Sequence, residues 1–177
     1  MAAKYGCQQA FWLHGPDEEI TEAGAMNIFI LFHHENGKME LVTPHLDSCL
    51  SLPGIVRQSI LEIAREAKEL HISDRKVTIK EVLNGAENGT LVEMFCTGTA
   101  SFVTPVGKIY YDGVIHSLPL PESNKLFSQR YGSIHALHRG AFCQFPFRWI
   151  YYYGSNKPTG KETGKMHLSA LHCVAYV

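Results

Sequence analysis

Two apolar runs joined by a short polar turn constrain the fold more than any other feature of the sequence. Residues 27–32 read NIFILF and residues 39–43 read MELVT, with HHENGK between them. Asparagine followed by glycine accepts the positive φ angles of a type I′ turn, so Asn36-Gly37 predicts a β-hairpin. We therefore expect the two runs to form neighbouring antiparallel strands.

Two amphipathic segments after this hairpin predict helices. Residues 55–70, IVRQSILEIAREAKEL, repeat apolar residues at helical spacing and so create one apolar face. Residues 78–81, TIKE, match a capping box that opens a second, shorter helix, and Asn84-Gly85 is its expected end. The residues on the apolar face of the first helix are Val56, Ile60, Ile63, Ala64, Ala67 and Leu70.

Other apolar runs predict further strands. Residues 8–13, QQAFWL, and residues 19–21 precede the hairpin, while residues 91–113 return to strand character with a first break at Gly98. From about residue 131 the aromatic residues follow neither period, and we expect irregular structure there, largely disordered after residue 155. The expected fold class is mixed α/β (α+β), with strands around an amphipathic helix and an irregular C-terminal tail.

Composition excludes several classes of function. The 177 residues carry 16 Lys and Arg against 17 Asp and Glu, so no strong field indicates nucleic acid or an anionic membrane as partner. No apolar run approaches the ~20 residues of a spanning helix, and the N-terminus lacks the core of a signal peptide, so we do not expect secretion. The five scattered cysteines fit a reduced compartment rather than a disulfide or zinc framework.

The histidines do not predict a metal site. His33 and His34 are adjacent on an expected strand, where neighbouring side chains face opposite sides of the sheet, so they cannot bind one ion together. His135 and His138 have helical spacing but no third ligand. We therefore expect no metal.

Glu22, in the segment ITEAGAMN, is the first candidate for chemistry. It is either a strand-edge carboxylate bonded to neighbouring backbone or an acid held against the ring nitrogen of a bound cofactor. Pyridoxal phosphate needs such an acid, because a protonated pyridine is what makes it an electron sink. Both interpretations remain open from the residues alone.

Two further segments offer donors for an anion. Gly54 directly precedes the long expected helix, so the free N–H groups of Ile55 and Val56 would suit a phosphate, although most helix starts bind nothing. Arg57 is either a cation for the same anion or the partner of a surface acid. In CTGTASFVTPVG, the hydroxyl and amide of Thr99 offer further donors, unless Gly98 serves only a tight passage from strand to turn.

These motifs, in this order, resemble those of the branched-chain amino-acid aminotransferases, pyridoxal-phosphate enzymes of fold type IV. The matching segments are ITEAGAMNIFI, ELVTPHLDSCLSLPGIVRQSILEIA, VTIKEV and EMFCTGTASFVTPVGKIYYDG. The resemblance covers about residues 5–120. It implies a partial large domain over residues 1–127 and a divergent tail over residues 128–177.

The resemblance also implies roles for individual residues. Glu22 would hold the pyridine nitrogen, and the phosphate would lie between the helix start and the segment after the later strand. The cofactor-binding residues implied are Glu22, Ile55, Val56 and Thr99, and the substrate-binding residues implied are Ala25 and Ala100.

By this resemblance the chain would take part in amino transfer between Leu, Ile or Val and 2-oxoglutarate, in a homodimer located in the cytoplasm or the mitochondrion. The family's Schiff-base lysine lies upstream of the segment that matches residues 2–9, and Lys4 does not correspond to it. We therefore expect no catalytic residue here and no activity of the chain alone. The chain is then either a truncated gene model or a genuine short product, and the alternative function is a non-catalytic module that pairs with a full-length subunit.

Overall fold

The structure is a computed structural model that describes residues 5–46, 50–67, 70–99, 103–120 and 171–175. These residues form two five-stranded sheets and two helices. The mixed α/β fold class expected from the sequence is confirmed.

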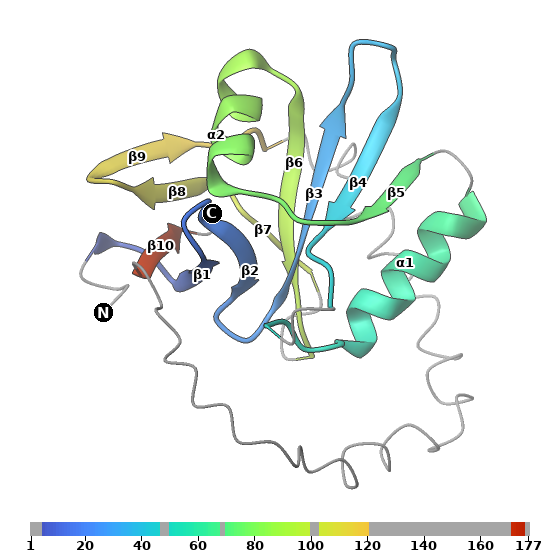
Figure 1. The fold of residues 1–177 in the computed structure, drawn as a ribbon, viewed down its shortest axis with the longest axis horizontal. Coiled ribbons are helices and arrows are strands. Elements are labelled where there is room, and N and C mark those ends of the chain that lie inside the picture. Colours follow the sequence, from blue (N-terminus) through green and yellow to red (C-terminus); the bar gives the residue numbers. More distant parts are fainter. Residues whose placement is uncertain (1–4, 47–49, 68–69, 100–102, 121–170, 176–177) are drawn as a thin grey trace, which may run out of the picture.

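The first sheet combines strands from both ends of the described chain. Its members, in spatial order, are β2 (Glu19–Ala23), β1 (Gln9–His14), β10 (Leu171–Ala175), β8 (Lys108–Tyr111) and β9 (Val114–Ser117). All neighbours in it are antiparallel. Strand β10 lies in the middle, between β1 and β8 (Figure 1).

The second sheet is the centre of the described molecule. Its spatial order is β5 (His71–Asp74), β4 (Met39–Thr43), β3 (Asn27–His33), β6 (Leu91–Thr97) and β7 (Thr104–Pro105). Only β4 and β5 pair in parallel, and the connection between them contains the first helix, as a parallel pair requires a crossover.

The two faces of the second sheet are covered by different elements. Helix α1 (Ile55–Ala67) packs Val56, Ile60 and Ala64 against one face, as its predicted apolar stripe requires, and adds Leu61, which that stripe did not include. Helix α2 (Ile79–Asn88) and the first sheet cover the other face in a separate apolar cluster (Figure 1). Neither of these two described helices is long and apolar enough to cross a membrane.

The predicted hairpin is confirmed, but its turn differs from the prediction. Strands β3 and β4 pair antiparallel, and the loop closes with hydrogen bonds from the His34 N–H to the Lys38 carbonyl and from the Gly37 N–H to the His34 carbonyl. Gly37 has a positive φ of 76°, whereas Asn36 does not, so the turn is not type I′. A three-residue loop with a left-handed glycine closes the hairpin instead. Both residues of Asp112-Gly113, between β8 and β9, do have positive φ.

The second helix extends beyond its predicted end. Asn84-Gly85 lies inside α2, which continues to Asn88 and ends on Gly89 in the left-handed conformation. Gly85 is buried, and a Cβ there would lie 2.8 Å from a ring carbon of Phe32. This glycine therefore permits close packing of α2 on β3 rather than ending the helix.

The tail prediction is wrong for one segment. Leu171–Ala175 forms β10, although irregular structure was expected throughout the region after residue 131. Residues 121–170 and 176–177 lie outside the described residues, so the expectation for them stays a prediction.

Candidate functional site

Three segments that are far apart in the sequence meet at one end of the central sheet. They are the turn from β2 into β3, the segment that leads into α1, and the end of β6; all lie at the lower edge of the view in Figure 1. Asn27, the first residue of β3, pairs in register with Thr97, the last residue of β6. The three segments that the sequence analysis singled out as candidates for the site are therefore neighbours in the fold.

The peptide of Leu52 joins two of these segments. Its N–H donates to the Glu22 carboxylate, with 2.7 Å between Leu52 N and Glu22 Oε1. Its carbonyl accepts from the Asn27 side-chain amide, with 2.7 Å between Asn27 Nδ2 and Leu52 O. The Ser51 hydroxyl also donates to the Thr21 carbonyl. One short segment is thus fixed to β2 and β3 immediately before α1 begins.

Gly54 allows the helix to start against β3. A Cβ at this position would lie 2.2 Å from Oδ1 of Asn27. The first helical hydrogen bond runs from the Gln58 N–H to the Gly54 carbonyl, so the N–H groups of Ile55 and Val56 lie outside the helical pairing. The first turn carries no acidic side chain, so its partial positive charge is available to an anion.

Arg57 has a structural partner. Its side chain is buried and donates to the Asp74 carboxylate, with 2.9 Å between Nη2 and Oδ2, and to the Pro44 carbonyl at 3.1 Å. The sequence left two roles open for Arg57, and the structure shows the second of them, pairing with an acid, here Asp74. The residue anchors the first turn of α1 to the ends of β4 and β5.

Glu22 is bonded to backbone, as the first of its two interpretations expects, and its half-buried position bears on the second. It is a strand carboxylate bonded to backbone, through the Leu52 N–H, yet it is half-buried and burial raises its pKa. The hydrogen bond from Leu52 opposes that rise without cancelling it. A protonated nitrogen placed against this carboxylate would therefore be bound favourably.

The remaining predicted residues lie around the same end of the sheet. Ala25 is exposed in the turn between β2 and β3, and Thr99 is exposed just after β6. A Cβ on Gly98 would lie 3.0 Å from Cγ of Met26, so these two passages are neighbours. Ala100 and Lys4 lie outside the described residues.

The structure adds two residues that sequence reasoning missed. Asn27 positions the Leu52 carbonyl, and Thr97 has a buried hydroxyl, Oγ1, with no hydrogen-bond partner. Neither carries a local signal, because their roles depend on the register between β3 and β6. A carboxylate, N–H groups outside the helical pairing and an unsatisfied hydroxyl form a donor and acceptor set that fits a heteroaromatic ring bearing a phosphate.

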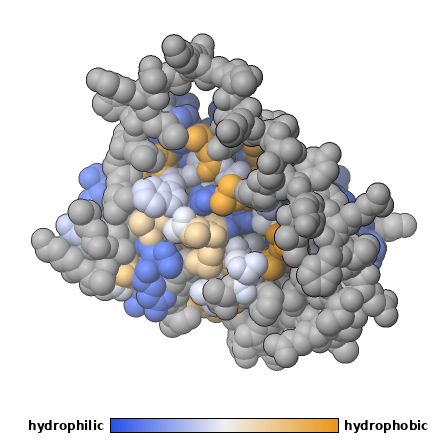
Figure 2. All heavy atoms as spheres, turned by 90° about the horizontal axis from the view of Figure 1, so that it is seen from below, coloured by the Kyte–Doolittle hydropathy of each residue, from blue (hydrophilic) through white to orange (hydrophobic). Residues whose placement is uncertain are grey.

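The surface around this end is partly apolar. Leu52 is 59% exposed and Ile55 is 52% exposed, directly beside the Glu22 carboxylate and the helix start. Figure 2 views the molecule from this side and shows hydrophobic and hydrophilic residues interspersed on the described surface. Such a mixture suits a planar ligand with polar ends.

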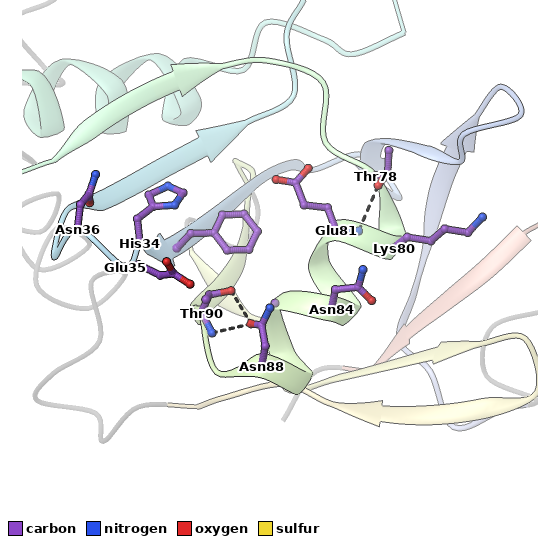
Figure 3. A pocket seen from close by; sticks show the side chains of 11 residues that line it. His34, Glu35, Asn36, Thr78, Lys80, Glu81, Asn84, Asn88 and Thr90 are labelled. Carbon is purple, nitrogen blue, oxygen red and sulfur yellow. Dashed lines mark hydrogen bonds between the residues drawn. The ribbon is translucent and has the colours of Figure 1, made fainter.

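A groove of about 850 Å³ lies elsewhere, between α2 and the β3–β4 hairpin (Figure 3). Its polar side chains are largely engaged with protein groups: Asn88 accepts from Thr90, Thr78 caps α2, and His34 contacts Glu40. It shares no lining residue with the three converging segments. We therefore assign the candidate site to the end of the central sheet and not to this groove.

Comparisons with known proteins identify the family of the chain. The amino-transferase class IV family matches residues 1–109. The mitochondrial branched-chain-amino-acid aminotransferase of Rattus norvegicus is 48% identical over 122 residues, which are 69% of this chain and 31% of that protein. The cytosolic branched-chain-amino-acid aminotransferase of Caenorhabditis elegans is 47% identical over 110 residues, which are 62% of this chain and 26% of that protein.

A solved structure shows the same fold. A fold IV-transaminase from Curtobacterium pusillum superposes with a TM-score of 0.57 at 14% identity, covering 80% of this chain and 40% of that chain. At that identity the likeness concerns the fold alone. The chain spans less than a third of the length of the two curated relatives above, while the family match includes all three converging segments.

Proposed function

Because the chain belongs to the amino-transferase class IV family, we propose that it binds pyridoxal phosphate and forms the cofactor-binding part of a branched-chain amino-acid aminotransferase. The observation that carries the proposal is the backbone of Leu52, whose N–H donates to the Glu22 carboxylate and whose carbonyl accepts from the Asn27 side chain, three residues before α1 begins. When bound, this cofactor supplies an electron sink for reactions at the α-carbon of an amino acid.

Each end of the cofactor has residues suited to it. Glu22 binds the protonated pyridine nitrogen, which replaces the water lost by this half-buried carboxylate and lowers its raised pKa. The N–H groups of Ile55 and Val56, with the Thr99 hydroxyl, bind the phosphate at the positive end of α1. The Leu52 hydrogen bonds keep these two ends at a fixed separation.

The substrates proposed are Leu, Ile or Val with a 2-oxo acid such as 2-oxoglutarate. Two relatives at 47% and 48% identity are named for branched-chain amino acids, which supports this class. Ala25 and Ala100 are the residues proposed to contact the substrate. We further propose a homodimer, in the mitochondrion or the cytosol, the compartments for which those relatives are named.

Binding without turnover is the behaviour we propose for the 177 residues by themselves. Transamination requires a lysine amine that holds the aldehyde and moves a proton. The lysines of the described residues lie away from the three converging segments: Lys38 in the β3–β4 loop, Lys76 and Lys80 beside Glu19 and Glu18, and Lys108 in β8. Glutamate formation from leucine and 2-oxoglutarate at the rate of an ordinary aminotransferase would contradict this part of the proposal.

Calorimetric titration with pyridoxine 5′-phosphate tests the cofactor site. This probe carries the ring and the phosphate but no aldehyde, so it forms no imine with surface lysines. Glu22→Gln should weaken its binding about tenfold or more, because a charge-assisted hydrogen bond to the ring nitrogen is lost. Glu62→Gln, an exposed change on α1, is the matched control and should leave the affinity unchanged. Equal affinities for wild type and Glu22→Gln would remove Glu22 from the site.

A further inference from the structure

Thr97 lies on the face of the central sheet that α1 covers. Side chains alternate along β6, so Thr97 shares a face with Phe95, which belongs to the apolar cluster under α1. Its cross-strand partner Asn27 shares that face with Phe29 of the same cluster. Thr97 is therefore on the α1 side of the sheet, at the end where the helix begins.

The start of α1 is within reach of this position. The side-chain amide of Asn27 bonds to the Leu52 carbonyl, and its Oδ1 lies against Gly54, the residue before α1. Cross-strand neighbours on one face have Cβ atoms about 5 Å apart. The Thr97 hydroxyl consequently lies beside the segment that presents the unpaired N–H groups of the helix.

Thr97 is exceptional among the buried threonines of the described residues. Thr21 donates to the Trp12 carbonyl at 2.9 Å, and Thr43 donates to the Ile28 carbonyl at 2.8 Å. Thr97 is 1% exposed, and its Oγ1 has no partner. A buried hydroxyl without a hydrogen-bond partner destabilises the fold. A ligand that accepts a hydrogen bond from it would remove this cost and explain its position.

We propose that the Thr97 hydroxyl donates a hydrogen bond to the phosphate bound at the start of α1. This inference rests on the proposed function and adds a phosphate donor to it. The ligand-free chain then contains a buried donor with no protein partner, which the phosphate satisfies. Removing the hydroxyl has opposite effects on the two states: the ligand-free chain gains stability and the phosphate complex loses affinity.

Thr97→Val tests this directly, because valine keeps the shape and removes the hydroxyl. Calorimetric titration of the full chain with pyridoxine 5′-phosphate should show affinity about tenfold weaker or more, the loss expected for a hydrogen bond to a charged group. Affinity for pyridoxine, which lacks the phosphate, should not change. The thermal midpoint of the ligand-free variant should equal or exceed that of wild type. If the hydroxyl had only a structural role, its removal would lower this midpoint.

Two further variants complete the experiment. Thr97→Ser keeps a hydroxyl and should retain wild-type affinity, and it remains informative if Thr97→Val does not fold. Thr21→Val removes a satisfied hydroxyl of similar burial and should lower the thermal midpoint without changing phosphate affinity. If wild type binds and Thr97→Val binds equally well, this inference is wrong and the proposed function stands. If wild type does not bind the phosphorylated probe, both the proposed cofactor site and this inference are overturned.

Discussion

Gly54 and Asn27 depend on each other at the point where the chain enters α1. A methyl group on residue 54 would lie 2.2 Å from Asn27 Oδ1, and Asn27 is buried with its amide bonded to Leu52. Gly54→Ala must therefore displace the Asn27 amide and break that hydrogen bond. We expect the free energy of unfolding to fall by about 1–3 kcal/mol, the cost of an unsatisfied buried polar group, as measured by urea denaturation.

A double-mutant cycle separates this contact from any intrinsic effect of alanine. In an Asn27→Ala background the obstructing oxygen is absent, so Gly54→Ala should cost markedly less than in wild type. Equal costs in both backgrounds would show that Asn27 is not the reason for glycine at this position.

Residues of the site differ in how visible they are in the sequence. Glu22, Ile55 and Val56 could be predicted, because an acid among small residues and a glycine before an amphipathic helix are local patterns. Asn27 and Thr97 could not, since each acquires its role only through the register of β3 on β6. The assignment of ligand contacts to any of them stays a prediction.

At the scale of elements, an ionic network joins β4, the segment after β5, and α2. Arg75 donates to the carboxylates of both Glu40 and Glu81, and His34 contacts Glu40 from the hairpin side. Burial alone would raise the pKa of Glu40, but hydrogen bonds from Arg75, Ser73 and His34 outweigh it and lower the pKa to about 2. The ionised carboxylate therefore stabilises the folded chain.

The pH dependence of stability has a definite sign for this network. A lowered folded pKa means that the contribution of Glu40 is complete above the ordinary value of 4.5 and is lost as the pH falls from there to about 2. Glu40→Gln should cost about 1.5–3 kcal/mol at neutral pH and flatten the acid limb of a stability–pH curve measured by denaturation. The exposed change Glu66→Gln serves as the control and should leave the curve unaltered. If the Glu40→Gln variant still loses stability as the pH falls below 4.5, other carboxylates cause that loss.

Elements with a clear local signal in the sequence were predicted well, and those defined by packing were not. The hairpin of β3 and β4 follows from two apolar runs joined by Asn36-Gly37, and the helix α1 follows from amphipathic spacing. Strand β5 has four residues and pairs in parallel with β4, so its identity depends on a partner rather than on its own pattern. The end of α2 was wrongly predicted at Gly85, because this glycine makes room for the Phe32 ring and does not terminate the helix.

At the scale of the whole molecule, the first sheet is completed by a segment from the far end of the chain. Strand β10 pairs with β1 through residues such as Cys173 opposite Ala10, and with β8 through Cys173 opposite Tyr110. The sequence around it has no period that marks a strand. Pairing across more than 160 positions is a long-range event that local propensity does not encode.

Proline at position 173 tests whether this strand closes the sheet. Because β10 has neighbours on both sides, Cys173→Pro removes a backbone donor from an interior strand, which is disfavoured there. We expect a lower thermal midpoint and faster amide hydrogen exchange in both β1 and β8, while α1 and the central sheet keep their protection. Cys173→Ala retains the backbone N–H and is the matched control. If exchange in β1 and β8 is the same in the proline variant as in this control, then β10 does not hold the two halves of the first sheet together in solution.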